Sequence, residues 1–241
     1  MCGRIVLKAP AEQIAREFAL ASVPELVPRY NIAPGQPVAV ILAGPNTDRV
    51  CRFMRWGLLP AWSTASGRVT PLINARGETA AAKPAFRAAF HERRCLLPID
   101  GFYEWRRQGQ RREPFYFTGG ADASGADAAG GRLLALAGLW EGRREDDDQP
   151  GETCAILTTQ ANAVVRPIHD RMPVILPPSA FDRWLLTPPD QAAALQALLV
   201  PAEPSALQAW PVGTQVNRAS SDGPQLIAPR RKETPPQLGL F

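Results

Sequence analysis

Residues 95–118 read CLLPIDGFYEWRRQGQRREPFYFT, and three strands are predicted within them. Aromatic and branched apolar residues dominate the segments 95–98, 101–105 and 114–118, and such residues favour strands. The polar sequence RRQGQRRE joins the last two segments. Proline supplies 25 of the 241 residues, which favours short strands and turns over long helices.

The flanking sequence continues this pattern in both directions. Further strands are predicted at residues 3–6, 38–42, 49–56, 133–140, 154–159 and 173–176. Helices are predicted at residues 10–20, 80–93, 181–186 and 191–199, with Pro84 in the first turn of the second. We therefore predict one α+β domain over residues 1–221. It carries a flexible insertion at about 119–131 (GGADASGADAAGG) and a polar, proline-rich tail over 222–241.

The composition is that of a soluble globular protein, with 45% hydrophobic and 21% charged residues. No apolar run approaches the ~20 residues that span a membrane, and the N-terminus lacks a secretory signal, so we expect a cytoplasmic protein. The four cysteines are widely spaced without a CxxC pair, so neither a metal site nor a disulfide framework is predicted.

The net charge is +4, and 24 of the 27 cations are arginines. Arginine suits phosphate recognition, although a coding bias explains the same excess equally well.

Cys2 becomes the first residue if Met1 is removed, which the small cysteine side chain permits. The mature chain would then carry an α-amine and a thiol on one residue. Such a pair reacts with an aldehyde in two steps: the amine forms a Schiff base, and the thiol then closes a thiazolidine ring. Position alone supports equally the alternative that Cys2 is a structural residue at the start of a buried strand.

Three other polar residues stand in apolar surroundings. Glu104 lies between Tyr103 and Trp105, where a partly buried carboxylate suits general acid/base work, but a salt bridge to an arginine is an equally simple reading. His169 lies in RPIHDRMPV, where it could shuttle protons or serve as a structural hydrogen-bonding residue. Asn74 follows the apolar pair of PLINARGET.

Six sequence blocks occur in an order that resembles the SOS response-associated peptidase (SRAP) family. They are MCGR at the N-terminus, RYNIAPG (29–35), WGLLPAW (56–62), INARGET (73–79), GFYEW (101–105) and IHDRMPV (168–174). The late segment VNRASSDGPQLI (216–227) resembles the closing stretch of the family as well. The resemblance implies an α+β fold in which antiparallel strands form a barrel-like core with peripheral helices.

The resemblance also implies a reaction. SRAP proteins sense abasic sites in single-stranded DNA and attach to them through the N-terminal cysteine as a thiazolidine. Cys2 would be the nucleophile, and Asn74 would position its amine and the sugar. Glu104 would act as general acid/base, and His169 would assist opening of the deoxyribose. The family name further implies a peptidase activity that removes Met1, and AP-lyase activity is a related expectation. No cofactor and no metal are expected.

By the same resemblance, five residues would contact DNA. Arg4, Arg76 and Arg171 would bind phosphates beside the lesion. Pro34 and Trp62 would form an apolar shelf for neighbouring bases. We expect a monomer that works on nucleoid DNA during the DNA damage response.

Two other classes of protein fit parts of the sequence. Class II glutamine amidotransferases also use an N-terminal cysteine, but they need a GHxR-type motif and an Asn-Gly element early in the chain. No histidine precedes His91 and no Asn-Gly pair occurs. The other alternative is a non-catalytic single-stranded DNA-binding module in which Cys2 is structural.

The chain ends in QLGLF, after a proline-containing stretch. The pattern resembles the peptide by which bacterial repair proteins dock on the DNA sliding clamp. Gln237, Leu238, Leu240 and Phe241 would make that contact, with the two apolar side chains at 240 and 241 filling a pocket. The alternative is that these residues fold back on the domain.

Overall fold

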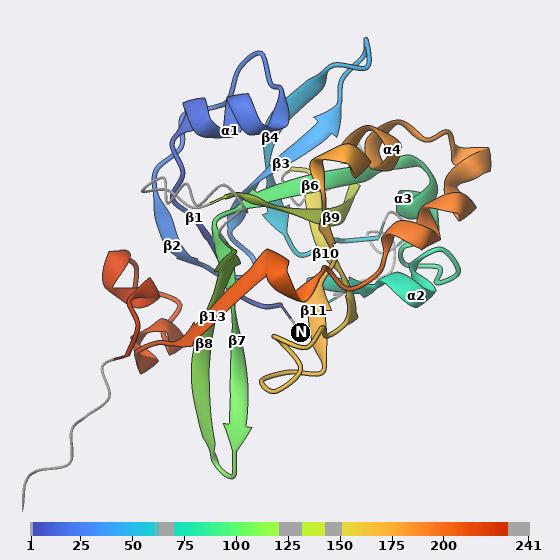
Figure 1. Cartoon of the computed structure of the whole chain (residues 1–241). Coiled ribbons are helices and arrows are strands. Elements are labelled where there is room, and N and C mark those ends of the chain that lie inside the picture. The colour runs from blue at the N-terminus through green and yellow to red at the C-terminus, as the bar shows by residue number, and fades with distance from the viewer. Residues whose placement is uncertain (1, 61, 63–69, 121–131, 143–150, 231–241) are drawn as a thin grey trace, which may run out of the picture.

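The strands form two sheets in the computed structural model, which describes residues 2–60, 62, 70–120, 132–142 and 151–230 (Figure 1). The first is antiparallel, with the strand order β13-β8-β7-β1-β2. Its strands are β1 (Ile5–Leu7), β2 (Arg29–Ile32), β7 (Gly101–Gln108), β8 (Arg111–Gly119) and β13 (Leu207–Pro211). The predicted strands at 101–105 and 114–118 are thus confirmed as neighbours in this sheet.

Among the residues described, the second sheet has eight strands: β3 (Pro37–Ala43), β4 (Arg49–Trp56), β5 (Asn74–Arg76), β6 (Arg94–Ile99), β9 (Leu134–Glu141), β10 (Thr153–Gln160), β11 (Arg171–Pro173) and β12 (Ile175–Leu176). Five of them close into a ring. The pairings run from β3 to β4, β10, β9 and β6 and return to β3. The mixed α+β prediction is confirmed, but a wholly antiparallel arrangement is wrong, because β10 pairs in parallel with β4 and β5. Long connections of chain separate β10 from both partners, as parallel pairing requires.

The core lies inside this ring and continues beneath the first sheet. Every residue of β6 is buried, and β9 is nearly as deeply placed. Gly138 of β9 marks a close approach, because a Cβ there would lie 2.5 Å from Leu97 and 2.8 Å from the Cys95 sulfur. Phe102 and Phe117 stack with ring centroids 4.9 Å apart and join the same core.

The helices are short and peripheral. They are α1 (Ala11–Phe18), α2 (Gly77–Ala80), α3 (Arg87–Glu92) and α4 (Phe181–Leu186). The 3₁₀ segments are η2 (Pro178–Ala180), η3 (Pro189–Leu198), η4 (Pro204–Ala206), η5 (Thr214–Asn217) and η6 (Pro224–Ile227). The continuous helix predicted over 80–93 is wrong: Pro84 lies in the turns between α2 and α3, where it disfavours helical backbone before it. None of the helices in the described ranges is long and apolar enough to cross a membrane.

Asp100 joins the two sheets at the turn from β6 to β7. Its carboxylate accepts the amides of Lys8 and Ala9 at 2.6 and 2.9 Å and pairs with the Lys8 ammonium at 3.1 Å. Its carbonyl accepts the Thr118 hydroxyl at 2.7 Å. These contacts fix the end of β1 beside β7, and thereby the path of the N-terminal residues.

Residues beyond 221, the predicted domain end, also pack against the domain. Leu226 is 1% exposed, and the Arg230 amide donates to the Pro211 carbonyl at 2.8 Å. The segment 222–230 therefore packs on the first sheet and is not part of a free tail. At the predicted insertion, Gly119 ends β8 and the Gly120 amide bonds to Ala206, while residues 121–131 lie outside the described ranges.

Candidate active site

Cys2 is fully buried at the N-terminal approach to β1. Ile5 and Val6 pair with Phe102 and Gly101 of β7, and the Tyr103 amide donates to the Arg4 carbonyl at 3.0 Å. Since the pairing is antiparallel, the chain before Arg4 runs alongside the segment that carries Glu104. The sheet register therefore brings residue 2 near residue 104.

Asn74 anchors the Cys2 backbone from the second sheet. It begins β5, which lies beside β10 with Asn74 opposite Ile156. Its Nδ2 donates to the Cys2 carbonyl at 2.8 Å. Its Oδ1 is buried and has no hydrogen-bond partner among the described residues. This oxygen can accept a hydrogen bond from an amine or hydroxyl bound beside Cys2.

Glu104 and His169 face each other. The Glu104 carboxylate is buried, and its Oε2 lies 4.0 Å from His169 Nε2. His169 Nδ1 accepts the Arg171 amide at 3.0 Å and lies 2.9 Å from the Asp170 carboxylate. Nδ1 is thus engaged by the Arg171 amide and the Asp170 carboxylate, and Nε2 is the ring nitrogen that faces Glu104.

The pKa of the Cys2 thiol is raised, which favours its protonated form. Burial raises its pKa well above the ordinary value, the Glu104 charge raises it further, and a hydrogen bond from the Arg4 backbone offsets part of this increase. A thiol with a raised pKa needs a base when it adds to an electrophile. Beside burial, the Glu104 carboxylate is the charge that raises the thiol pKa, which makes it the candidate for that base.

A groove of about 450 Å³ adjoins His169. Its walls are formed by Trp105, Arg106, Arg107, Pro167, Ile168, His169 and Asp170. His169 thus touches the groove on one side and Glu104 on the other. Within the described ranges, no three His, Cys, Asp or Glu side chains cluster closely enough to hold a metal ion.

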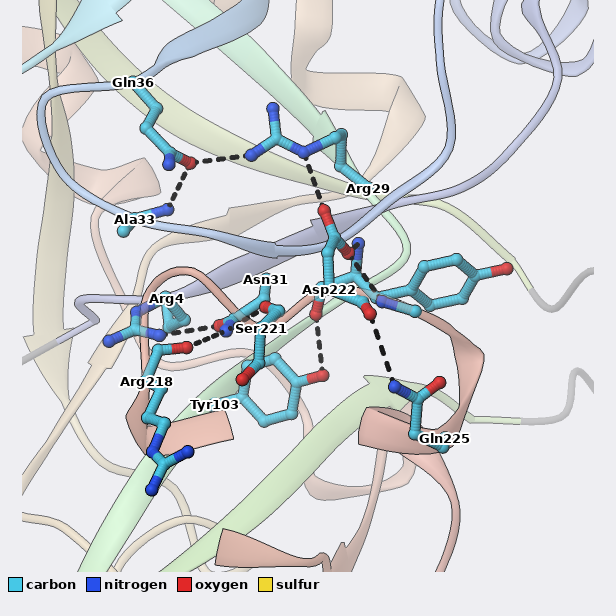
Figure 2. Close-up of polar contacts among 12 residues, drawn as sticks. Arg4, Arg29, Asn31, Ala33, Gln36, Tyr103, Arg218, Ser221, Asp222 and Gln225 are labelled. Carbon is cyan, nitrogen blue, oxygen red and sulfur yellow. Dashed lines mark hydrogen bonds and ion pairs between the residues drawn. The ribbon is translucent and has the colours of Figure 1, made fainter. Parts of the chain in front are cut away.

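Arg4 is held at one edge by a buried network (Figure 2). Its Nη1 donates to Asn31 Oδ1 at 2.7 Å and to the Val216 carbonyl at 2.8 Å. Its guanidinium lies 5.9 Å from the Trp105 ring centroid. The buried Nε has no hydrogen-bond partner among the described residues, and burial lowers the pKa of the group. The network thus fixes the position of the Arg4 guanidinium beside Trp105.

The other predicted DNA-contacting residues differ in their surroundings. Arg76 is exposed at the end of β5. Arg171 instead forms a bidentate ion pair with Glu78 at 2.6 and 2.8 Å and donates to the Thr158 carbonyl at 2.7 Å. The ion pair with Arg171 lowers the pKa of the Glu78 carboxyl. This ion pair joins β11 to α2.

The two residues of the predicted apolar shelf are accessible. Pro34 is exposed at a turn, where the following Gly35 has a φ of +86°. This pairing of proline with a left-handed glycine is the pattern of a type II turn. Trp62 is 55% exposed. The predicted tail contacts, residues 237–241, lie outside the described residues.

Asn31 supports Arg4, and sequence reasoning did not single it out. Its side chain is 1% exposed, and its Nδ2 donates to the Val216 carbonyl at 3.4 Å. The same Nδ2 donates to the carbonyls of Arg218 and Ser221 at 3.0 and 2.8 Å (Figure 2). Nearby, Asp222 accepts the Tyr30 amide at 2.6 Å and pairs with Arg29 at 2.8 Å. The only signal in the sequence was that Asn31 lies within the block RYNIAPG, because its partners are far away along the chain.

Comparison with known proteins gives a consistent result. The family model described as SOS response associated peptidase (SRAP) matches residues 1–219. Abasic site processing protein YoqW of Bacillus subtilis (strain 168) is 34% identical over 231 residues, covering 94% of this chain and 99% of that protein. Abasic site processing protein YedK of Escherichia coli (strain K12) is 29% identical over 238 residues, covering 95% and 100%. Abasic site processing protein HMCES of Gallus gallus is 29% identical over 274 residues, covering 99% and 80%.

Solved structures share the fold. A protein from Bacteroides thetaiotaomicron superposes with a TM-score of 0.78 at 22% identity, covering 95% of this chain and all of that one. A protein from Bordetella bronchiseptica superposes with a TM-score of 0.70 at 28% identity, covering 88% and 100%.

Proposed function

This chain belongs to the SOS response-associated peptidase family, and from that premise we propose that it crosslinks to abasic sites in single-stranded DNA through Cys2. The names of its relatives indicate abasic-site processing. The observation that carries the covalent step is the buried Cys2, which is tied to Asn74 and lies within electrostatic reach of Glu104. The crosslink would shield the lesion during repair.

The reaction begins once Met1 is gone and the Cys2 amine is free. The amine adds to the deoxyribose aldehyde, and loss of water gives an imine. The thiol then adds to the imine carbon: a C–S bond forms, and the thiol proton moves to the nitrogen. Glu104 receives and returns protons in both steps, and Asn74 Oδ1 holds the amine. His169 assists opening of the closed sugar by moving the hydroxyl proton.

The direct test uses a single-stranded oligonucleotide with one abasic site. The wild-type protein should give a slower band that survives denaturation, while the same oligonucleotide without the lesion gives none. A glutaminase assay tests the amidotransferase alternative. A non-catalytic binding module would hold the DNA without forming the resistant band.

The acid/base pair gives a kinetic prediction. Glu104→Gln keeps the shape of the side chain but cannot accept a proton, so we expect crosslinking and its reversal to slow at least tenfold. His169→Ala should slow both directions as well. Single-turnover rates at saturating DNA measure these effects and separate them from binding. Glu12→Gln is the matched control, because it neutralises an exposed carboxylate on α1 that makes no contact with the site residues. Wild-type rates in Glu104→Gln and His169→Ala would refute the acid/base roles of these two residues.

The remaining activities follow from the same site. We propose that Met1 is removed by the protein itself with the groups that later process the sugar, and that lyase cleavage of the strand can follow imine formation. Arg4 and Arg76 would bind phosphates, and Pro34 and Trp62 would support neighbouring bases. Arg171 could join them only by leaving its ion pair with Glu78.

We further propose that the tail docks on a DNA sliding clamp. The sequence TPPQLGLF places three apolar residues after a stiff proline pair, which lowers the loss of entropy on binding. Tethering would concentrate the protein where single-stranded lesions arise. The full-length protein should bind immobilised clamp with micromolar-range affinity, and Leu240→Ala with Phe241→Ala should abolish this binding. Glu233→Ala in the same tail is the control, and absence of binding by the wild type would remove the clamp as a partner.

A further inference from the structure

The hairpin formed by β7 and β8 extends beyond the body of the protein (Figure 1). We name residues 106–113 of this hairpin the basic ribbon. Its strands pair up to Gln108 opposite Arg111, and a two-residue turn closes it. Gly109, the first turn residue, has a φ of +58°, as the first position of a type II′ turn requires. The ribbon is thus a regular extension of the sheet that carries Glu104.

Charge is compensated at the root of the ribbon and uncompensated toward its tip. At the root, Arg106 lies opposite Glu113 and contacts it at 2.6 Å, and Arg230 contacts the same carboxylate at 2.6 Å. These arginines, Arg106 above all, lower the pKa of the Glu113 carboxyl. One residue further out, Arg107 lies directly opposite Arg112, and both are exposed.

Like charges at directly opposed positions destabilise a strand pair. Arg111, the residue before Arg112 in β8, adds a third exposed guanidinium on the other face of the hairpin. Across the ranges that the structure describes, no carboxylate forms an ion pair with any of these three arginines. A polyanion bound along the ribbon would supply the missing countercharge.

The basic ribbon is continuous with the candidate active site. Arg106 and Arg107 form one wall of the groove whose other wall includes His169. Arg107 lies three positions beyond Glu104 in β7, which is about 10 Å along a strand. A strand of DNA that leaves the site through this groove would therefore reach the arginines within a few nucleotides of the lesion.

We propose that the basic ribbon binds the phosphates of single-stranded DNA leaving the active site, through Arg107, Arg111 and Arg112. This proposal rests on the proposed function and extends the DNA path beyond the lesion. The other ribbon side chains outside the root are Gln108 and Gln110, so the ribbon offers no aromatic surface for stacking bases. Its contacts are therefore independent of base sequence.

The test compares non-covalent binding of long and short oligonucleotides that lack an abasic site. For Arg107→Ala with Arg112→Ala, we expect about tenfold weaker binding of a long oligonucleotide. The log–log salt dependence should flatten by about 1.4, from roughly 0.7 for each lost phosphate contact. A short oligonucleotide that reaches only the active site should bind to this variant as tightly as to the wild type. Fluorescence anisotropy at several salt concentrations measures the affinities for the long and short oligonucleotides and their salt dependence.

Arg16→Ala with Arg87→Ala is the matched control. It removes the same charge from exposed positions on α1 and α3, away from the ribbon (Figure 1). The control should bind both oligonucleotides like the wild type. The ribbon variant should also melt at the wild-type temperature or above it, because a repulsive pair has been removed.

Wild-type affinity and salt dependence in the ribbon variant would overturn the proposal. An equal loss on long and short oligonucleotides would overturn it too, because the arginines would then act at the lesion site itself. Failure of the proposed function would look different: the wild type would form no covalent product with an abasic oligonucleotide.

Discussion

Replacing Cys2 with alanine should abolish the covalent DNA product completely. Alanine keeps a small second residue, so Met1 can still be removed, and it keeps the α-amine that forms the imine. It lacks the sulfur that converts the reversible imine into a thiazolidine. On a denaturing gel without reductant, the wild type should give the shifted band and the variant none.

The same variant separates the two chemical steps. Borohydride reduces an imine to a stable amine, so Cys2→Ala should give a crosslink when the reaction is treated with borohydride. Cys51→Ala is the control, since Cys51 lies half-buried on β4 and has no place in the mechanism. An undiminished band from Cys2→Ala without reductant would assign the bond to another nucleophile.

The mass of the purified protein provides an independent check. A retained Met1 would place Cys2 inside the peptide chain, where it has a thiol but no amine and cannot form the ring. The intact mass should therefore be lower than that of the full sequence by one methionine. A retained methionine in an active protein would contradict the mechanism.

Local features of the fold were predictable from the sequence. The hairpins β3–β4 and β7–β8 join strands that are adjacent in sequence, so their strand signals and connecting turns were sufficient. The site residues were found because each lies in a compact sequence block. Their roles rest on the resemblance of those blocks to a family and not on hydrophobic periodicity.

Long-range pairings could not be predicted. The ion pair between Glu78 and Arg171 joins residues 93 positions apart, so the arginine was expected to be free for phosphate. Asn31 contacts carbonyls up to 190 positions away, and nothing in its local pattern indicates burial. The parallel pairings of β10 likewise depend on how distant strands meet. Each of these features is decided by tertiary contacts that no short window of sequence contains.

Replacing Arg94 should strongly lower the stability of the fold. Arg94 begins β6, its side chain is almost fully buried, and its guanidinium is bound by backbone carbonyls. Nε donates to the Trp184 carbonyl at 2.7 Å and Nη1 to the Phe90 carbonyl at 2.9 Å. Further bonds reach the carbonyls of His91 and Thr187. Burial lowers the pKa of the group, but four acceptors compensate its charge.

These carbonyls belong to the C-terminal ends of α3 and α4. The last carbonyls of a helix have no partner within it, and the helix dipole makes that end negative. A single arginine between two such ends satisfies both and fixes the helices against β6. Because each helix has only six residues, neither is stable without such tertiary contacts.

Arg94→Met should therefore lower the free energy of unfolding by about 3–5 kcal/mol, the size expected when several buried acceptors lose a charged donor. Methionine fills a similar volume, so the loss reports the hydrogen bonds more than a cavity. Arg94→Lys keeps the charge with fewer directed donors, so its free energy of unfolding should lie between those of the wild type and Arg94→Met. Urea denaturation measures all three proteins, with Arg87→Met on the exposed face of α3 as the control. A loss below about 1 kcal/mol would show that the carbonyls find other donors, since that is the net contribution of one ordinary hydrogen bond.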